Sequence, residues 1–212
     1  MFARELGLWR PTTQALFGLQ WIVGDGAPWL FHWVNLLGHA AVTELVFLVL
    51  LELMSGAVAL HGALIFTVHP VHVEAVANIV GLSEITSAGF FLGACLLHLR
   101  GPAESKWPRA AALGALYAIA FGSKEGAVTP PAVIFLLDAA RGRLGWRDLP
   151  QYLEERWRAY AAMVIVAGAL LLVRWEILGT IANPIGPLGT DLLIDVPRIW
   201  TVAEVWGNYA RL

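Results

Sequence analysis

Long apolar runs are the feature of this sequence that most restricts its fold. Residues 29–53 and 160–178 are each about the length of a helix that crosses a bilayer, roughly 20 residues, and residues 79–99 form a third such run. The chain is 58% hydrophobic and 14% charged, whereas soluble domains carry about 25% charged residues. We therefore expect an integral membrane protein of the all-α class, a polytopic bundle of transmembrane helices.

Shorter apolar runs lie between these spans, at residues 56–68, 110–121 and 127–137. Their length leaves open whether they are spans, re-entrant segments or buried helices. Counting them all, with a further helix from residue 199, predicts about six or seven membrane helices.

Three regions follow from this pattern. Residues 1–28 form an amphipathic, aromatic-rich segment on the outer face, and residues 29–178 form the multi-span membrane domain. Residues 179–212 form a Gly/Pro-rich outer loop and the start of a further membrane helix.

The placement of basic residues predicts the topology. If every apolar run spans, residues 100–109 and 139–158 fall on one side of the membrane. That side holds eight of the 14 Lys and Arg residues, namely Arg100, Lys106, Arg109, Arg141, Arg143, Arg147, Arg156 and Arg158. The loops on the other side, at residues 69–74, 122–126 and 179–197, hold only Lys124. Because cytoplasmic loops are enriched in Lys and Arg, the eight-residue side is predicted to be cytoplasmic.

A polar segment between two apolar runs is the first candidate site. It carries two imidazoles, an amide and two carboxylates: His69, His72, Glu74, Asn78 and Glu84. Such groups are costly at membrane depth unless they are used. A helix running on from Pro70 would place Glu74, Asn78 and Gly81 on one face. This pattern favours a polar pocket open to the outer side, and the alternative is a helix N-terminus with interfacial polar residues.

Cations expected on the same side suggest a phosphate site. Lys124 and Glu125 lie in one outer loop, and Arg174 lies near the end of the last long span. Arg binds phosphate as a fork and Lys as a point charge, while carboxylates and imidazoles suit proton transfer from a hydroxyl. Together they match the needs of transfer from a lipid-phosphate donor. The simpler interpretations are a solvated loop pair for Lys124–Glu125 and a snorkelling side chain for Arg174.

Other chemistries find little support. The spacing His69-x-x-His72-x-Glu74 lacks a third His or Cys, so no metal site is predicted. Cys95 is the single cysteine, which excludes a disulfide framework, and a net charge of −2 without a basic run gives no reason to expect nucleic-acid binding.

Polar residues inside the first long run, Asn35, His39 and Glu44, are predicted to make contacts between helices rather than to face lipid. A proton path through Glu44, Glu84 and His39 would suggest a transporter, but the sequence shows no inverted repeat.

The sequence also resembles a known family. The similarity rests on these segments in order: Trp9-Arg10-Pro11-Thr12-Thr13, the run from Phe31 to Ala40, the run His69-Pro70-Val71-His72-Val73-Glu74 to Glu84, Ser123-Lys124-Glu125-Gly126, Leu137-Asp138, and Val173-Arg174-Trp175 to Asn183-Pro184. They resemble the membrane domain of the transmembrane and tetratricopeptide-repeat proteins, a family of glycosyltransferase-C fold.

The resemblance implies a function. Members would transfer mannose from dolichyl-phosphate-mannose to Ser or Thr of secretory-pathway proteins in the endoplasmic reticulum. Bacterial relatives would use a polyprenyl-phosphate sugar in the inner membrane. Lys124 and Arg174, with Glu125, would hold the donor phosphate. Glu74 and Glu84 would order the pocket through His69, His72 and Asn78.

Departures from the family pattern leave alternatives open. The resemblance implies an additional first helix and an acidic loop with the proton acceptor, which this chain does not show, so no catalytic residue is assigned. Leu82 stands where the family usually has Arg, and tetratricopeptide repeats are absent from the 212 residues. We therefore expect a fragment of an active enzyme, or else an inactive truncated paralogue or a non-enzymatic membrane subunit.

Overall fold

The protein is described by a computed structural model, which places residues 9–102, 106–141 and 149–179. Within these ranges the chain forms eight α-helices and three short 3₁₀ helices, without a strand. The predicted all-α class is confirmed.

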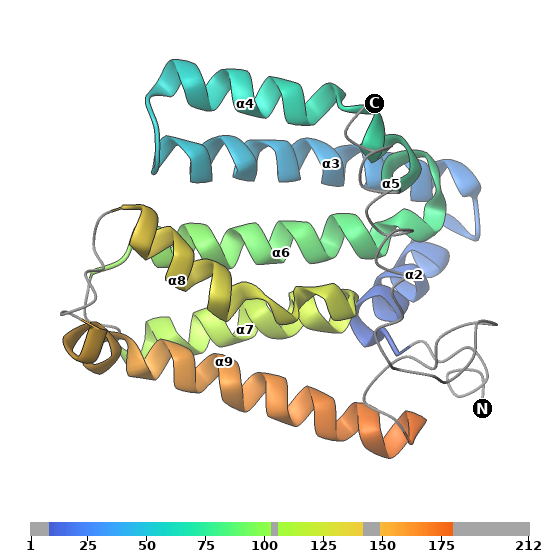
Figure 1. Cartoon of the computed structure of the whole chain (residues 1–212). Helices are drawn as coiled ribbons and strands as arrows, with labels where there is room; N and C mark the ends of the chain where they lie inside the picture. Colours follow the sequence, from blue (N-terminus) through green and yellow to red (C-terminus); the bar gives the residue numbers. More distant parts are fainter. Residues whose placement is uncertain (1–8, 103–105, 142–148, 180–212) are drawn as a thin grey trace, which may run out of the picture.

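Long helices stack side by side as a bundle (Figure 1). They are α3 (Pro28–Leu51), α4 (Gly56–Val68), α6 (Leu82–Leu99), α7 (Trp107–Ser123), α8 (Pro130–Ala140) and α9 (Leu149–Leu178). The helices α2 (Pro11–Gly24) and α5 (Val73–Ala77) lie at one end of the bundle, which we call the α2 end (Figure 1). The C-terminal ends of α3, α6 and α8 lie at the opposite end, which we call the arginine end (Figure 1).

Three helices are long and apolar enough to cross a membrane: α3, α6 with the preceding turn (Ile79–Leu99), and α9. A fourth span arises if α4 and the segment Pro70–Ala77 count as one, broken by a 49° bend. The described residues thus contain fewer spans than the predicted six or seven. The helix α8 is too short to cross a membrane, and α7 is not among the helices that are long and apolar enough to do so. The helix predicted from residue 199 lies outside the described residues.

Prolines mark where the helices start. Pro occupies the first or second position of α2, α3, α7, α8 and the 3₁₀ helix η1 (Pro70–His72), where its missing N–H costs no hydrogen bond.

The prediction that one helix runs on from Pro70 to Gly81 is wrong, however. After α5 the chain becomes extended at Asn78 (φ −88°, ψ 129°) and turns through η2 (Ile79–Gly81) into α6. The Asn78 side chain accepts a hydrogen bond from the Val80 amide, a local competitor of the helix that breaks it here.

The core lies where α7 packs between α6 and α9. Leu113, Tyr117, Ile134 and Met163 are almost fully buried there. In contrast, α3, α4 and α9 expose large apolar side chains such as Trp33, Leu64, Ile165 and Leu172. Exposed apolar faces on long helices are what contact with lipid acyl chains requires.

A buried polar network also crosses the bundle near its arginine end. Asp138 of α8 is fully buried, and its Oδ2 lies 2.7 Å from His98 Nε2 of α6. The Tyr152 hydroxyl of α9 donates to the same oxygen at 3.0 Å. One carboxylate thereby joins three helices. Burying a charged group is costly unless it has hydrogen-bonding partners of this kind.

The ends of α3, α6 and α8 meet at the arginine end. Glu52 accepts from Arg100 at 3.0 Å and from Arg141 at 2.6 Å, and Arg141 also donates to the carbonyls of Glu52 and Leu99. Hydrogen bonds from Arg100 and then Arg141 hold the pKa of the Glu52 carboxyl below its usual value. The basic residues that we predicted on the cytoplasmic side therefore lie at one end of the bundle, as far as the structure describes them.

Candidate functional site

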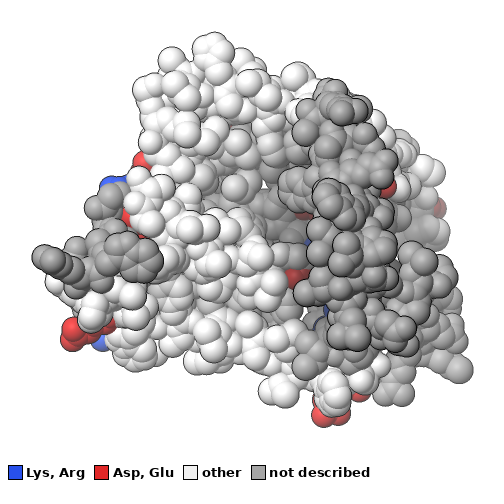
Figure 2. All heavy atoms as spheres, in the orientation of Figure 1, with Lys and Arg blue, Asp and Glu red and all other residues white. Residues whose placement is uncertain are grey.

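A cavity of about 480 Å³ opens at the α2 end of the bundle. Its polar lining comes from distant parts of the chain: Arg10, His39, His72, Glu74, Asn78, Ser83 and Glu84. Phe66 and Ile85 add apolar walls. Figure 2 shows charged atoms at the arginine end, while the described surface next to it along the bundle is largely uncharged. Its size and mixed lining suit a small polar ligand.

Side chains fix the segment that forms one wall of the cavity. His69 accepts the Val71 amide through Nδ1, and Asn35 of α3 donates to the Asn78 carbonyl at 2.8 Å. Asn35 is 1% exposed, so the prediction of an interhelical contact at this position is confirmed.

Aromatic rings cluster at the cavity. The ring centroids of Phe66 and His72 are 4.2 Å apart, and those of His39 and His72 are 5.3 Å apart. His39 Nε2 also lies 3.2 Å from the Thr67 carbonyl oxygen, so His39 both joins α3 to α4 and lines the cavity. No set of three His, Cys, Asp or Glu side chains in the described part of the chain is arranged to hold a metal ion.

Glu44 differs from the prediction. Its side chain is exposed on α3 rather than packed against another helix. Helical periodicity explains this, because Asn35, Val42 and Val49 take the buried face of α3 and Glu44 falls away from it.

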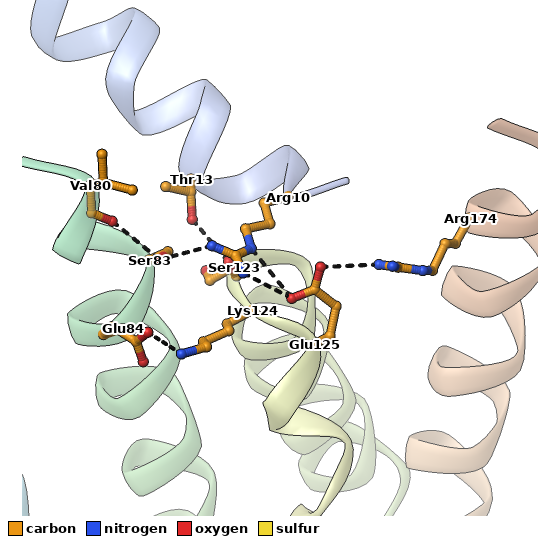
Figure 3. Close-up of polar contacts among 9 residues, drawn as sticks. All are labelled: Arg10, Thr13, Val80, Ser83, Glu84, Ser123, Lys124, Glu125 and Arg174. Carbon is orange, nitrogen blue, oxygen red and sulfur yellow. Dashed lines mark hydrogen bonds and ion pairs between the residues drawn. The ribbon is translucent and has the colours of Figure 1, made fainter. Parts of the chain in front are cut away.

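Two arginines, Arg10 and Arg174, bind the same carboxylate, that of Glu125 (Figure 3). Arg10 donates through Nε at 3.3 Å and Nη2 at 3.2 Å to Oε2 of Glu125. Arg174 donates to Oε1 of the same carboxylate at 3.2 Å and is 3% exposed. Beside this group, Lys124 pairs with Glu84.

Glu125 is held ionised by its surroundings. Partial burial opposes its negative charge, but a backbone hydrogen bond and the two guanidinium groups outweigh that effect. The pKa of the Glu125 carboxyl therefore lies below its usual range.

The helix α2 brings Arg10 to this place. Arg10 precedes α2, and Thr13 one turn later donates to the Ser123 carbonyl at 3.1 Å, with both residues buried. A Cβ on Gly122 would lie 2.7 Å from Thr12 Oγ1, so α2 sits directly on the end of α7.

The structure brings most of the predicted site residues together. His72, Glu74, Asn78 and Glu84 line the cavity, and His69 caps the turn beside it. Lys124, Glu125 and Arg174 lie next to the cavity without lining it, each in an ion pair. Whether these residues bind a donor phosphate stays a prediction.

Sequence reasoning missed Arg10 as a site residue, although its side chain is a cation that lines the cavity. The available signal was an Arg-Pro pair that starts a helix on the predicted outer side. Its partner Glu125 is 115 positions away, a pairing that no local pattern reveals.

These features define a polytopic helical membrane protein with a polar cavity at one end of its bundle. The chain is 37% identical over 206 residues to the protein O-mannosyl-transferase Tmtc2 of Drosophila melanogaster, a match that covers 92% of this chain. It is 34% identical over 124 residues to the protein O-mannosyl-transferase TMTC3 of Homo sapiens, and 36% identical over 136 residues to that named tmtc2 of Xenopus laevis, covering 57% and 61% of this chain. The chain belongs to this family over the segment that it shares with these relatives.

That segment is a part of each relative. The matches cover 21%, 14% and 16% of the fly, human and frog proteins, respectively. No family model matches the chain, and no solved structure matches it.

Proposed function

We propose that this chain forms the sugar-donor side of a membrane O-mannosyltransferase. The donor would be mannose on a dolichyl or other polyprenyl phosphate, and the acceptors would be Ser and Thr of secretory-pathway proteins at the endoplasmic reticulum membrane. The observation that carries the proposal is the polar cavity at the α2 end, formed by the segments that carry the family resemblance.

The cavity suits the head group of such a donor. A phosphodiester in a partly desolvated pocket needs a cation, and Arg10 supplies one inside the cavity. Glu74 and Asn78 offer hydrogen-bond partners for sugar hydroxyls, and the rings of Phe66 and His72 offer a flat apolar surface for the sugar face. The exposed apolar faces of the long helices would leave the polyprenyl chain in lipid.

Activity also requires a proton acceptor for the Ser or Thr hydroxyl. We assign none among the described residues. Glu74 and Glu84 are proposed to shape and polarise the cavity, as expected from the sequence. Glu84 also forms an ion pair with Lys124. Lys124 therefore contacts a residue of the cavity lining but does not line the cavity itself.

A binding measurement tests this function. The purified chain in lipid nanodiscs should bind dolichyl-phosphate-mannose but not dolichol, which lacks the phosphate. Arg10→Ala should weaken binding by roughly ten- to hundredfold, the usual range for a hydrogen bond to a charged group.

The matched control is Lys106→Ala, which removes an exposed cation at the arginine end and should leave the affinity unchanged. Equal binding of dolichol and dolichyl-phosphate-mannose by the wild-type chain would reject the proposed donor site.

A further inference from the structure

We infer that Glu125 and Arg174 are positioning residues that hold the guanidinium of Arg10 at the cavity, an inference that rests on the proposed function. They would act on the donor phosphate through Arg10, which replaces the direct contact that we expected for them from the sequence.

The direction in which each group faces supports this arrangement. Arg10 and Ser83 line the cavity, whereas Glu125 and Arg174 do not. Figure 3 shows Arg10 between Ser83 and Glu125, and Arg10 Nη1 lies 3.4 Å from Ser83 Oγ. Glu125 therefore contacts Arg10 from outside the cavity. Part of the N–H groups of the Arg10 guanidinium stay directed toward the cavity.

The carboxylate is itself held from a second side. Each of its oxygens has a different arginine partner, Oε2 with Arg10 and Oε1 with Arg174. Arg174 is 3% exposed on α9, which packs along α7, so it provides a fixed point. The contacts thus run from α9 through Glu125 to the start of α2.

Arg10 has particular need of such support. It is the residue before α2, with a non-helical backbone (φ −131°, ψ 70°), so the helix does not restrict its side chain. A long side chain that is free to move loses rotamer entropy when it binds a ligand, and fixing it in advance removes part of that cost.

The opposite role for Glu125 is also physically definable. A carboxylate and a phosphate compete for the same N–H groups, so Glu125 could block Arg10 instead of presenting it. The two roles predict changes of opposite sign when the charge of Glu125 is removed.

A double-mutant cycle distinguishes them. The probe is polyprenyl phosphate, with polyprenol as the uncharged reference, and the protein is the whole chain in nanodiscs. If Glu125 positions Arg10, Glu125→Gln should weaken phosphate binding by roughly three- to tenfold, less than Arg10→Gln, because it acts through one neighbouring hydrogen-bonded group. In the Arg10→Gln background, Glu125→Gln should have no further effect, since nothing remains for it to position.

Arg174→Gln provides an independent variant and should weaken binding in the same direction as Glu125→Gln, and again only when Arg10 is present. Glu155→Gln, a carboxylate change on α9 at the arginine end, is the matched control and should leave binding unchanged. Thermal unfolding of each variant checks that the fold is retained, and Glu125→Asp gives a milder second variant if Glu125→Gln does not fold.

Each outcome has a distinct meaning. Tighter binding by Glu125→Gln shows competition and overturns the inference, as does a change that is equal with and without Arg10. Wild-type binding that depends on Arg10 but not on Glu125 overturns it while the proposed function stands. Failure of the wild-type chain to prefer polyprenyl phosphate over polyprenol overturns the proposed function itself.

Discussion

At the scale of single residues, one backbone contact shapes the cavity wall. Gly81 and Ala75 both line the cavity, and a Cβ built on Gly81 would lie 2.0 Å from the Ala75 carbonyl oxygen. That obstacle is backbone, which cannot rotate away as a flexible side chain does. Glycine at this position therefore allows the chain to fold back after α5.

Gly81→Ala is predicted to destabilise the protein and to deform the cavity. Overpacking of this kind costs about 1–3 kcal/mol or more, because the backbone must shift. The expected results are a lower unfolding temperature and weaker binding of polyprenyl phosphate. Gly126→Ala is the control, since a Cβ there meets nothing within 4 Å. Equal stability of the two variants would contradict the prediction.

Single residues also show where sequence reasoning succeeds and fails. His72, Glu74 and Glu84 were predictable because polar groups at a membrane-facing helix end are costly without a use. Arg10 was not, because its role depends on a contact with Glu125 across 115 positions.

At the scale of elements, the arginine end is held by side chains that satisfy helix termini. Arg141 is 12% exposed and donates to the carbonyls of Glu52 and Leu99, which end α3 and α6, as well as to the Glu52 carboxylate. The last carbonyls of a helix have no partner within it, so these hydrogen bonds replace lost contacts with water. Arg100 contacts the same carboxylate but is 50% exposed.

Arg141→Ala is predicted to destabilise the bundle more than Arg100→Ala. The first change strips partners from half-buried acceptors and should cost about 1–3 kcal/mol, whereas an exposed ion pair contributes about 0.2–1 kcal/mol. Chemical unfolding in detergent micelles measures both. A larger effect of Arg100→Ala would show that the carbonyl contacts contribute little.

The stability that the contacts of Glu52 with Arg100 and Arg141 provide should depend on pH. Glu52 has a lowered pKa in the folded protein, so its ionised form adds stability above its ordinary value of 4.5. That contribution is lost as the pH falls through the lower folded value. The stability difference between wild type and Arg141→Ala should therefore shrink below about pH 4.5.

The sequence predicted the long helices, but it did not predict the positions at which helices bend or end. The long apolar runs identified α3, α6 and α9, because their length and composition are decisive. The bend between α4 and α5 and the turn at Asn78 depend on local side-chain hydrogen bonds and on the packing of Gly81 against Ala75. A pattern of apolar and polar residues does not contain that information.

At the scale of the whole molecule, the bundle separates two kinds of charged surface. The arginine end gathers Arg100, Arg109 and Arg141 around the ends of three helices, where they bind carbonyls and Glu52. The α2 end holds the cavity, which is lined by carboxylates and imidazoles together with Arg10. The excess of basic residues at one end is the asymmetry that orients membrane proteins.

This asymmetry predicts that the arginine end is cytoplasmic and that the cavity opens on the opposite side of the membrane. Cys95 is the single cysteine and is buried, so Cys95→Ala gives a background for site-specific labelling. Ser55→Cys places a thiol in the exposed turn after α3 at the arginine end, and Gly126→Cys places one at the α2 end. In sealed vesicles with the cytoplasmic side outward, a membrane-impermeant maleimide should label Ser55→Cys at once and Gly126→Cys only after the vesicles are opened with detergent. The reverse order would place the cavity in the cytoplasm, where a donor site for secretory-pathway acceptors could not work.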